Sequence, residues 1–106
     1  ALSPEEISAL TKCLNDASSS VRVAAARALC HARHPTDALP ILASALEDGA
    51  QWTRLQAAIV FDEIDELAFP WIPHLQRCLE NQPNKYITRV ANRALNELLG
   101  TSHTVR

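Results

Sequence analysis

Glycine is scarce in this sequence: only two of its 106 residues are glycine, while 47% are hydrophobic. Chains that stay disordered combine low hydrophobicity with many polar, glycine and proline residues. A chain of this length has room for one compact domain. The composition therefore excludes a disordered or linker-like chain and favours a single packed, helical domain.

A surplus of positive charge and a long apolar run are also missing. The formal net charge is −2 and the pI is about 6.1, so the chain lacks the basic field that binds phosphate backbones. No apolar stretch approaches the roughly 18 residues of a membrane-spanning helix, and no signal peptide opens the chain. We therefore expect a soluble domain with neither nucleic acid nor membrane as its partner. Its start at Ala1 fits a segment of a longer protein.

Cysteine is present, but without the spacing that metal sites use. Cys13, Cys30 and Cys78 form no C-x-x-C pair, and each lies in an apolar stretch. We expect three reduced, buried side chains rather than a disulfide or a zinc site. The alternative metal site would take its ligands from Cys30, His31, His34 and His74. Their spacing matches no zinc template, so no metal ligand and no cofactor are predicted.

The chain repeats itself with a period of 32 to 33 residues. A triplet of Leu followed by two acidic or amide residues recurs at 14–16, 46–48 and 79–81. After each triplet come a short polar turn and an alanine-rich block, and the blocks align without gaps over residues 21–29, 53–61 and 87–95. The third block lies one residue farther from its triplet, which indicates an insertion in the turn that holds Pro83. A fixed period of this length is typical of solenoid proteins.

Local signals mark the ends of the predicted helices. Ser3 is predicted as the N-cap of the first helix, with Pro4 at the first helical position and Glu6 completing a capping box. The first helices of the second and third repeats are predicted over residues 37–48 and 70–81. Each has a proline near its first turn, where a missing N–H is tolerated.

The last helix carries an apolar stripe at helical spacing and ends at Gly100, which is predicted to form a left-handed cap. A flexible polar tail is predicted over residues 101–106. The whole pattern predicts an all-α fold, an α-solenoid (α-α superhelix) of three helical hairpins and six helices. One domain would span residues 1–100, with repeats at about 3–34, 36–67 and 69–100. Small alanines at inward positions let the hairpins pack closely into a continuous core.

The second helices of the three repeats share an approximate sequence pattern, which follows an Asp in the turn. The pattern is an apolar residue, Arg, two variable residues, Ala, Ala, a variable residue, Ala and Leu. This pattern resembles the HEAT repeat and covers essentially residues 3–100. The segments that carry a narrower resemblance are 22–30, 38–40, 52–58, 70–73 and 86–91. They are similar to the HEAT-repeat region in the C-terminal part of many bacterial sulfatase-family proteins. The resemblance implies a right-handed superhelical stack whose second helices line the inner surface.

A sulfatase parent would hydrolyse sulfate esters with a formylglycine made in a Cys/Ser-x-Pro-x-Arg motif, helped by a divalent metal. None of the three cysteines begins that motif, and the family's carboxylate metal ligands have no counterpart. The resemblance therefore implies no catalytic residue here, and the chain would be an accessory domain. Related sequences carry Gly where this chain has Arg33 and Asp65, and Asp tolerates a left-handed backbone better than Arg.

A charged pair recurs with the repeat. Asp16 and Arg22 stand at the same interval as Asp48 and Arg54. In stacked repeats we expect each Asp to cap the next helix and to bridge to an Arg of the neighbouring repeat. Ligand binding by these residues is the alternative.

Four acidic residues crowd the end of the second repeat, where the helix macrodipole favours cations: Asp62, Glu63, Asp65 and Glu66. They form either a solvated helix end near Arg33 or Lys85, or a docking site for a basic partner. No nucleophile accompanies them, so an acid–base catalytic pair is not predicted.

Aromatic residues recur as well. Trp52 and Tyr86 occupy equivalent positions at the start of their second helices, where edge packing is the default interpretation. They become a binding surface if Trp52, Arg89 and Arg93 share an exposed face. The turn after the second repeat is unusually apolar, with Leu67, Phe69 and Trp71 close together.

The sequence favours a non-catalytic protein-interaction or scaffold module. Its partner would be another protein or another domain of the parent chain, and self-association through a Phe69/Trp71 patch is a further alternative. The predicted contact residues are Trp52, Gln56, Phe69, Trp71, Arg89 and Arg93. The rival hypothesis is an accessory C-terminal domain of a sulfatase. The compartment would be cytoplasmic for a free-standing module and exported or periplasmic for part of a sulfatase.

Overall fold

The computed structural model describes residues 2–80 and 82–100. Over these residues the chain forms six α-helices, one 3-10 helix and no β-strand, which confirms the predicted all-α fold. The three hairpins are α1 (Pro4–Cys13) with α2 (Ser19–His31), α3 (Ala38–Ala45) with α4 (Gln51–Glu63), and α5 (Ile72–Cys78) with α6 (Lys85–Leu99). The 3-10 helix η1 (Asp65–Trp71) joins α4 to α5. The predicted tail, residues 101–106, lies outside the described residues.

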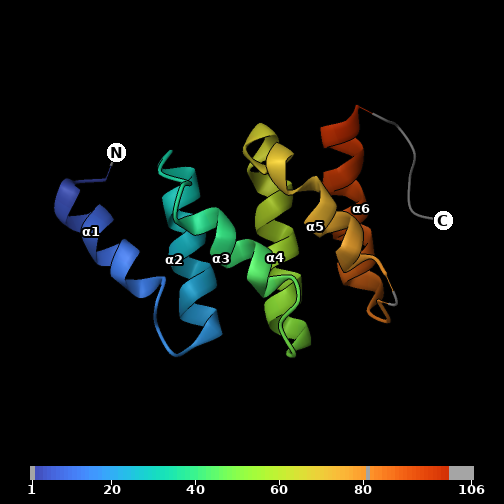
Figure 1. The fold of residues 1–106 in the computed structure, drawn as a ribbon, viewed down its shortest axis with the longest axis horizontal. Coiled ribbons are helices and arrows are strands. Elements are labelled where there is room, and N and C mark those ends of the chain that lie inside the picture. Colours follow the sequence, from blue (N-terminus) through green and yellow to red (C-terminus); the bar gives the residue numbers. More distant parts are fainter. Residues whose placement is uncertain (1, 81, 101–106) are drawn as a thin grey trace.

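The hairpins stack in chain order along the longest axis of the molecule (Figure 1). Helices α2, α4 and α6 stand side by side and run in the same direction, while α3 and α5 cross in front of them. Helix α3 contacts both α2 and α4, and α4 also contacts α2 and α6. The stack measures 44 × 28 × 17 Å, and this elongated form is that of an α-solenoid. We call the side formed by α2, α4 and α6 the second-helix face.

One hydrophobic core runs through all three hairpins, and alanine keeps its helices close together. Ala26, Ala57, Ala58 and Ala91 have no solvent exposure. Phe61 in α4 is the largest of the fully buried side chains. Because small residues let neighbouring helix backbones approach, each hairpin buries its apolar side against the next one.

The ends of the helices follow the predicted local chemistry. The Ser3 hydroxyl accepts a hydrogen bond from the Glu6 amide at 3.1 Å, and the Ser3 amide donates to the Glu6 carboxylate at 2.9 Å. This is the predicted capping box. Ser18 and Asn84 cap α2 and α6 in the same way, through side-chain oxygens. Gly100, with φ of 69°, is the predicted left-handed cap of α6.

The repeated Asp–Arg pair builds the turn inside a hairpin. The Asp16 carboxylate accepts from the Ser18 amide at 2.8 Å, and the Arg22 guanidinium donates to the Asp16 carbonyl oxygen at 2.7 Å. Asp48 and Arg54 reproduce the guanidinium–carbonyl bond at 2.7 Å. The predicted bridge to an Arg of the neighbouring repeat was therefore wrong. Both partners are engaged within one turn, and Ser18 rather than Asp16 caps the following helix.

The segment before α5 differs from the prediction. A helix was expected to begin at Pro70, but residues 65–71 form η1 and α5 begins at Ile72. Ala68 is fully buried, and Trp71 packs against the core three residues later. In a 3-10 helix residues three apart lie on the same side, so this geometry brings both residues to the core.

Two residues other than glycine end the second helices in a left-handed conformation. Arg33 has φ of 67° and Asp65, at the equivalent position of the next repeat, has φ of 51°. After α2 the His34 amide donates to the Leu29 carbonyl at 2.8 Å and the Arg33 amide donates to the Cys30 carbonyl at 3.1 Å. These two bonds form a Schellman motif, which requires the left-handed residue.

Replacing Arg33 with glycine should stabilise the domain. A left-handed backbone costs an L-residue about 1–2 kcal/mol, and the greater freedom of glycine in the unfolded chain removes part of that gain. We expect Arg33→Gly to raise the free energy of unfolding by about 1 kcal/mol, measured as a higher urea midpoint. Asp65→Gly should gain less, because Asp tolerates this conformation. Equal or lower stability of Arg33→Gly would show that Arg33 side-chain contacts outweigh the backbone strain.

Candidate functional site

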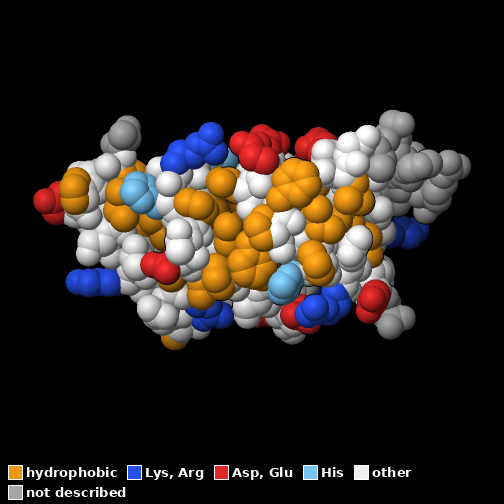
Figure 2. Space-filling model, turned by 45° about the horizontal axis from the view of Figure 1, so that its top comes forward, with side chains coloured by type: hydrophobic (Ala, Val, Ile, Leu, Met, Phe, Trp, Pro, Cys, Tyr) orange, Lys and Arg blue, Asp and Glu red, His pale blue; other side chains and the backbone are white. Residues whose placement is uncertain are grey.

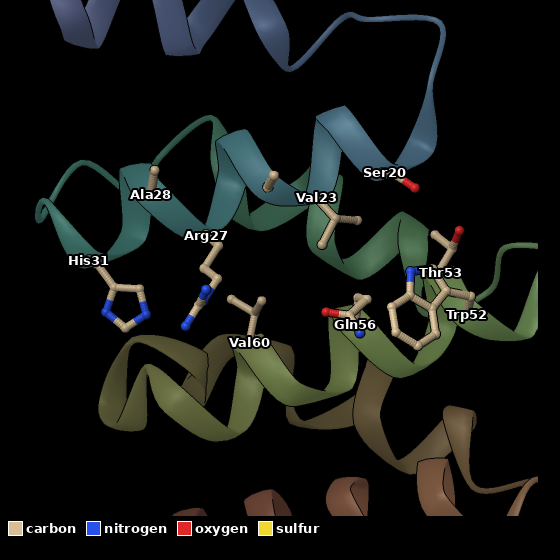
Figure 3. Close-up of a pocket in the computed structure, with 10 residues that line it drawn as sticks. Ser20, Val23, Arg27, Ala28, His31, Trp52, Thr53, Gln56 and Val60 are labelled. Atoms are coloured by element: carbon tan, nitrogen blue, oxygen red, sulfur yellow. The ribbon is translucent and has the colours of Figure 1, made fainter.

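An open groove of about 320 Å³ lies between α2 and α4 on the second-helix face (Figure 3). Its lining residues are Ser20, Val23, Ala24, Arg27, Ala28 and His31 from α2 and Trp52, Thr53, Gln56 and Val60 from α4. In Figure 3 the α4 side chains project toward α2, and Arg27 projects toward α4. The buried side chains of Val23, Thr53 and Val60 form its floor. The volume lies within the usual range for ligand sites.

The groove is open because α2 carries small side chains where α4 carries large ones. Ser20, Ala24 and Ala28 follow one another at intervals of four residues and therefore share one side of α2. Trp52 and Gln56 occupy the positions of Ser20 and Ala24 in the next repeat. The indole of Trp52 is left 64% exposed beside a partly apolar floor. An exposed tryptophan at the edge of such a groove is a common anchor for a protein partner.

A charged cluster borders the groove at the C-terminal ends of α2 and α4. The Arg27 guanidinium donates two parallel hydrogen bonds to the Glu63 carboxylate, at 2.8 and 3.0 Å. The His31 Nε2 atom lies 3.0 Å from the same carboxylate. These bonds lower the pKa of Glu63, first through the hydrogen bond from Arg27, and raise the pKa of Arg27. The cluster links the first repeat to the second at this end of the groove.

The cluster of Arg27, His31 and Glu63 should make the free energy of unfolding depend on pH in the acidic range. Because the pKa of Glu63 in the folded chain lies below its ordinary value of 4.5, the carboxylate stabilises the fold above that value. The contribution is lost as the pH falls through the lowered pKa. Glu63→Gln should therefore destabilise the domain at pH 7 by less than about 1 kcal/mol and reduce its loss of stability between pH 5 and about pH 3.

The measurement is the urea midpoint as a function of pH for both chains. Glu66→Gln is the control, because Glu66 is an exposed carboxylate with no ion pair among the described residues. Parallel pH curves for wild type and Glu63→Gln would contradict the assigned role of Glu63.

Two residues of the acidic run, Asp62 and Glu63, are paired with other residues than expected. Asp62, whose side chain is only 12% exposed, accepts from Arg93 of α6 at 2.6 and 2.8 Å. Glu63 is held by Arg27 and His31 of α2. The predicted neighbours Arg33 and Lys85 make no ion pair within the described part of the chain. The helix end is stabilised from both sides because second helices of neighbouring repeats lie side by side.

The predicted contact residues of α6 are exposed. Arg89 lies with its guanidinium carbon 6.0 Å from the centre of the Tyr86 ring, and Tyr86 is 66% exposed. Arg93 is 66% exposed although it pairs with Asp62. Thus Trp52, Arg89 and Arg93 are all accessible on second helices, but only Trp52 lines the groove.

Phe69 and Trp71 lie in η1, away from the groove. Phe69 is 54% exposed, whereas Trp71 is half-buried and packs against the core. The Trp71 ring centre is 4.9 Å from that of His74, with the planes tilted by 57°. Of these two predicted contact residues, Phe69 is the more accessible to a partner.

The cysteines among the described residues are poorly suited to act as nucleophiles. All three cysteines are free, and burial raises the pKa of Cys30 to about 11 and also raises that of Cys78. Such thiols are protonated at neutral pH and are poor nucleophiles. Across residues 2–80 and 82–100 no three His, Cys, Asp or Glu side chains meet in a way that could hold a metal ion. No helix in these ranges is long and apolar enough to cross a membrane.

The groove residues of α2, above all Arg27 and His31, were not predicted as contact residues from the sequence. The sequence does contain a signal for the groove. Ser20, Ala24 and Ala28 are small, share one side of α2, and correspond to larger residues in the next repeat. The bond between Arg27 and Glu63 joins residues 36 positions apart, one repeat period plus one helical turn. Opposite charges at that separation are therefore the sequence signal for this ion pair.

The stacked hairpins and the groove between their second helices place the protein in the class of α-solenoid repeat proteins. A family model described as HEAT repeats matches residues 7–96. The chain belongs to the HEAT repeat family. No curated protein matches the sequence.

Proposed function

We propose that this chain is a non-catalytic protein-interaction module that binds a peptide segment of a protein partner in the groove between α2 and α4. The observation that carries the proposal is the exposed Trp52 beside an open groove with buried apolar side chains in its floor. HEAT repeats suggest an interaction scaffold, and the groove supplies a particular surface for that role.

The groove offers complementary types of contact. Trp52 provides a large, rigid apolar surface that loses little conformational entropy on binding. Gln56, one helical turn later, has an amide that can both donate to and accept from a peptide backbone. Arg27 and Glu63 are already joined, so a partner need not neutralise an isolated charge there. Arg89 and Arg93 extend the accessible surface onto α6 for a longer partner.

Selection from a phage-displayed peptide library on the purified domain tests the proposal. We expect selected peptides to lose at least about tenfold in affinity for Trp52→Ala, with a smaller loss for Gln56→Ala. Tyr86→Ala is the matched control, because Tyr86 is an equally exposed aromatic at the equivalent position but lies outside the groove. Titrations would be measured by calorimetry, and circular dichroism would establish that each variant is folded. If no peptide is enriched, or Trp52→Ala and Tyr86→Ala behave alike, the proposal fails.

The sulfatase hypothesis remains a prediction from resemblance. In that setting the groove would receive a segment of the parent chain, and the module would brace the enzyme. The upstream reading frame distinguishes the two cases: a Cys/Ser-x-Pro-x-Arg motif would favour the accessory domain, and a nearby start codon would favour a free-standing module.

A further inference from the structure

The connection η1 differs from the other connection between hairpins. Between α2 and α3 the chain crosses in a short polar turn, residues 33–37. Between α4 and α5 it forms a seven-residue 3-10 helix of sequence DELAFPW. Figure 2 shows hydrophobic side chains gathered in a band across the side of the molecule that carries α3 and α5. Acidic side chains adjoin the upper edge of that band.

The exposed phenylalanine of η1, Phe69, lies between residues that are packed against the core. Ala68 beside it has no solvent exposure, and Leu67 and Trp71 both pack against the core. Phe69 nevertheless remains 54% exposed, and Pro70 and Pro73 are exposed next to it. Because its neighbours hold the backbone in place, Phe69 has a defined position. Binding of a partner at Phe69 therefore costs little conformational entropy in η1.

Negative charge lies beside Phe69. In a 3-10 helix residues three apart are eclipsed, so Glu66 lies on the same side of η1 as Phe69. Asp65 and Glu66 are exposed and make no ion pair among the described residues. They line a cleft of about 250 Å³ with Glu63, and its one guanidinium is that of Arg33. Glu63 is already paired with Arg27 and His31 of α2. The two remaining carboxylates, those of Asp65 and Glu66, face the single guanidinium of Arg33 and leave the cleft with a surplus of one negative charge.

We propose that Phe69 and the cleft beside it form a docking surface for a basic amphipathic segment of another protein. An apolar side chain of that segment covers Phe69, and its lysine or arginine side chains enter the cleft toward Asp65 and Glu66. A second copy of this chain fits less well. A symmetric pair that covers Phe69 with Phe69 would also bring the Asp65 and Glu66 carboxylates of both copies together, and like charges repel.

Two synthetic 14-residue peptides test the surface: one with leucine and lysine at the spacing of an amphipathic helix, and one with glutamate in place of each lysine. We expect the lysine peptide to bind and the glutamate peptide not to bind. Phe69→Ser should weaken the lysine peptide at least about tenfold. Asp65→Asn with Glu66→Gln should weaken it several-fold and reduce its salt dependence. Asn tolerates the left-handed backbone at position 65, so the fold is preserved.

The controls are Tyr86→Ser, which removes an exposed aromatic on α6, and Glu97→Gln, which removes an exposed carboxylate there. Both should leave the affinity of the lysine peptide unchanged. Equal binding by Phe69→Ser and Tyr86→Ser would overturn the proposal, because the peptide would then respond only to net charge. A wild-type dimer in sedimentation equilibrium that Phe69→Ser dissociates would also overturn it, in favour of a second copy as the occupant. Neither result bears on the groove, whose test depends on Trp52.

Discussion

Phe61→Ala is expected to lower the free energy of unfolding by about 3–5 kcal/mol. Phe61 is fully buried in α4, the helix that contacts α2, α3, η1 and α6. Removing its ring forfeits the transfer free energy of the ring and leaves a cavity that the packed helices fill only in part. The whole stability of a small domain is roughly 5–15 kcal/mol, so the variant should be close to unfolding at 37 °C.

The measurement is urea unfolding followed by far-ultraviolet circular dichroism. A lower midpoint with an unchanged m-value would show that the three hairpins still unfold together, whereas a smaller m-value would show that they have become uncoupled. Phe69→Ala is the matched control, because it makes the same substitution at a ring that is 54% exposed, and should cost much less. A loss below about 1 kcal/mol for Phe61→Ala would contradict the description of this ring as fully buried in a close-packed core.

The helices of this protein could be predicted because their signals are local. The capping box at Ser3 and Glu6, and the left-handed Gly100, depend on residues a few positions apart. The repeat period then defined the order of the hairpins. The start of α5 could not be predicted in the same way, because the buried Ala68 and the packing of Trp71 on the core decide it.

The candidate site was predicted only in part, for a different physical reason. Trp52 and Gln56 stand out as side chains of one helix, but the groove needs the small side chains of α2 opposite them. The pairing of Arg27 with Glu63 depends on the distance between neighbouring repeats, which no single helix specifies. The Asp–Arg pair showed the opposite error. Its regular spacing suggested a link between repeats, whereas each Arg reaches carbonyl oxygens in its own turn.

Exchanging two residues at equivalent repeat positions should change the free energy of unfolding by unequal amounts, and the larger effect is expected for Ala58→Asn. Ala58 of α4 is fully buried, whereas Asn92 of α6, at the same position of the next repeat, is partly exposed. Asp62 lies one helical turn from Ala58 and its carboxylate reaches Arg93 of α6, so this side of α4 faces the third repeat.

We expect Ala58→Asn to cost about 2–5 kcal/mol, because it overfills a close helix contact and buries an amide without partners. Ala26→Asn, at the fully buried equivalent position of α2, should cost a similar amount. Asn92→Ala should change stability by less than about 1 kcal/mol, since it removes one partly buried hydrogen bond to the Thr88 carbonyl and gains helix propensity. The measurement is the urea midpoint of each of the three variants, compared with that of the unsubstituted chain. Similar losses for Ala58→Asn and Asn92→Ala would mean that the two positions share one environment, which the difference in their burial contradicts.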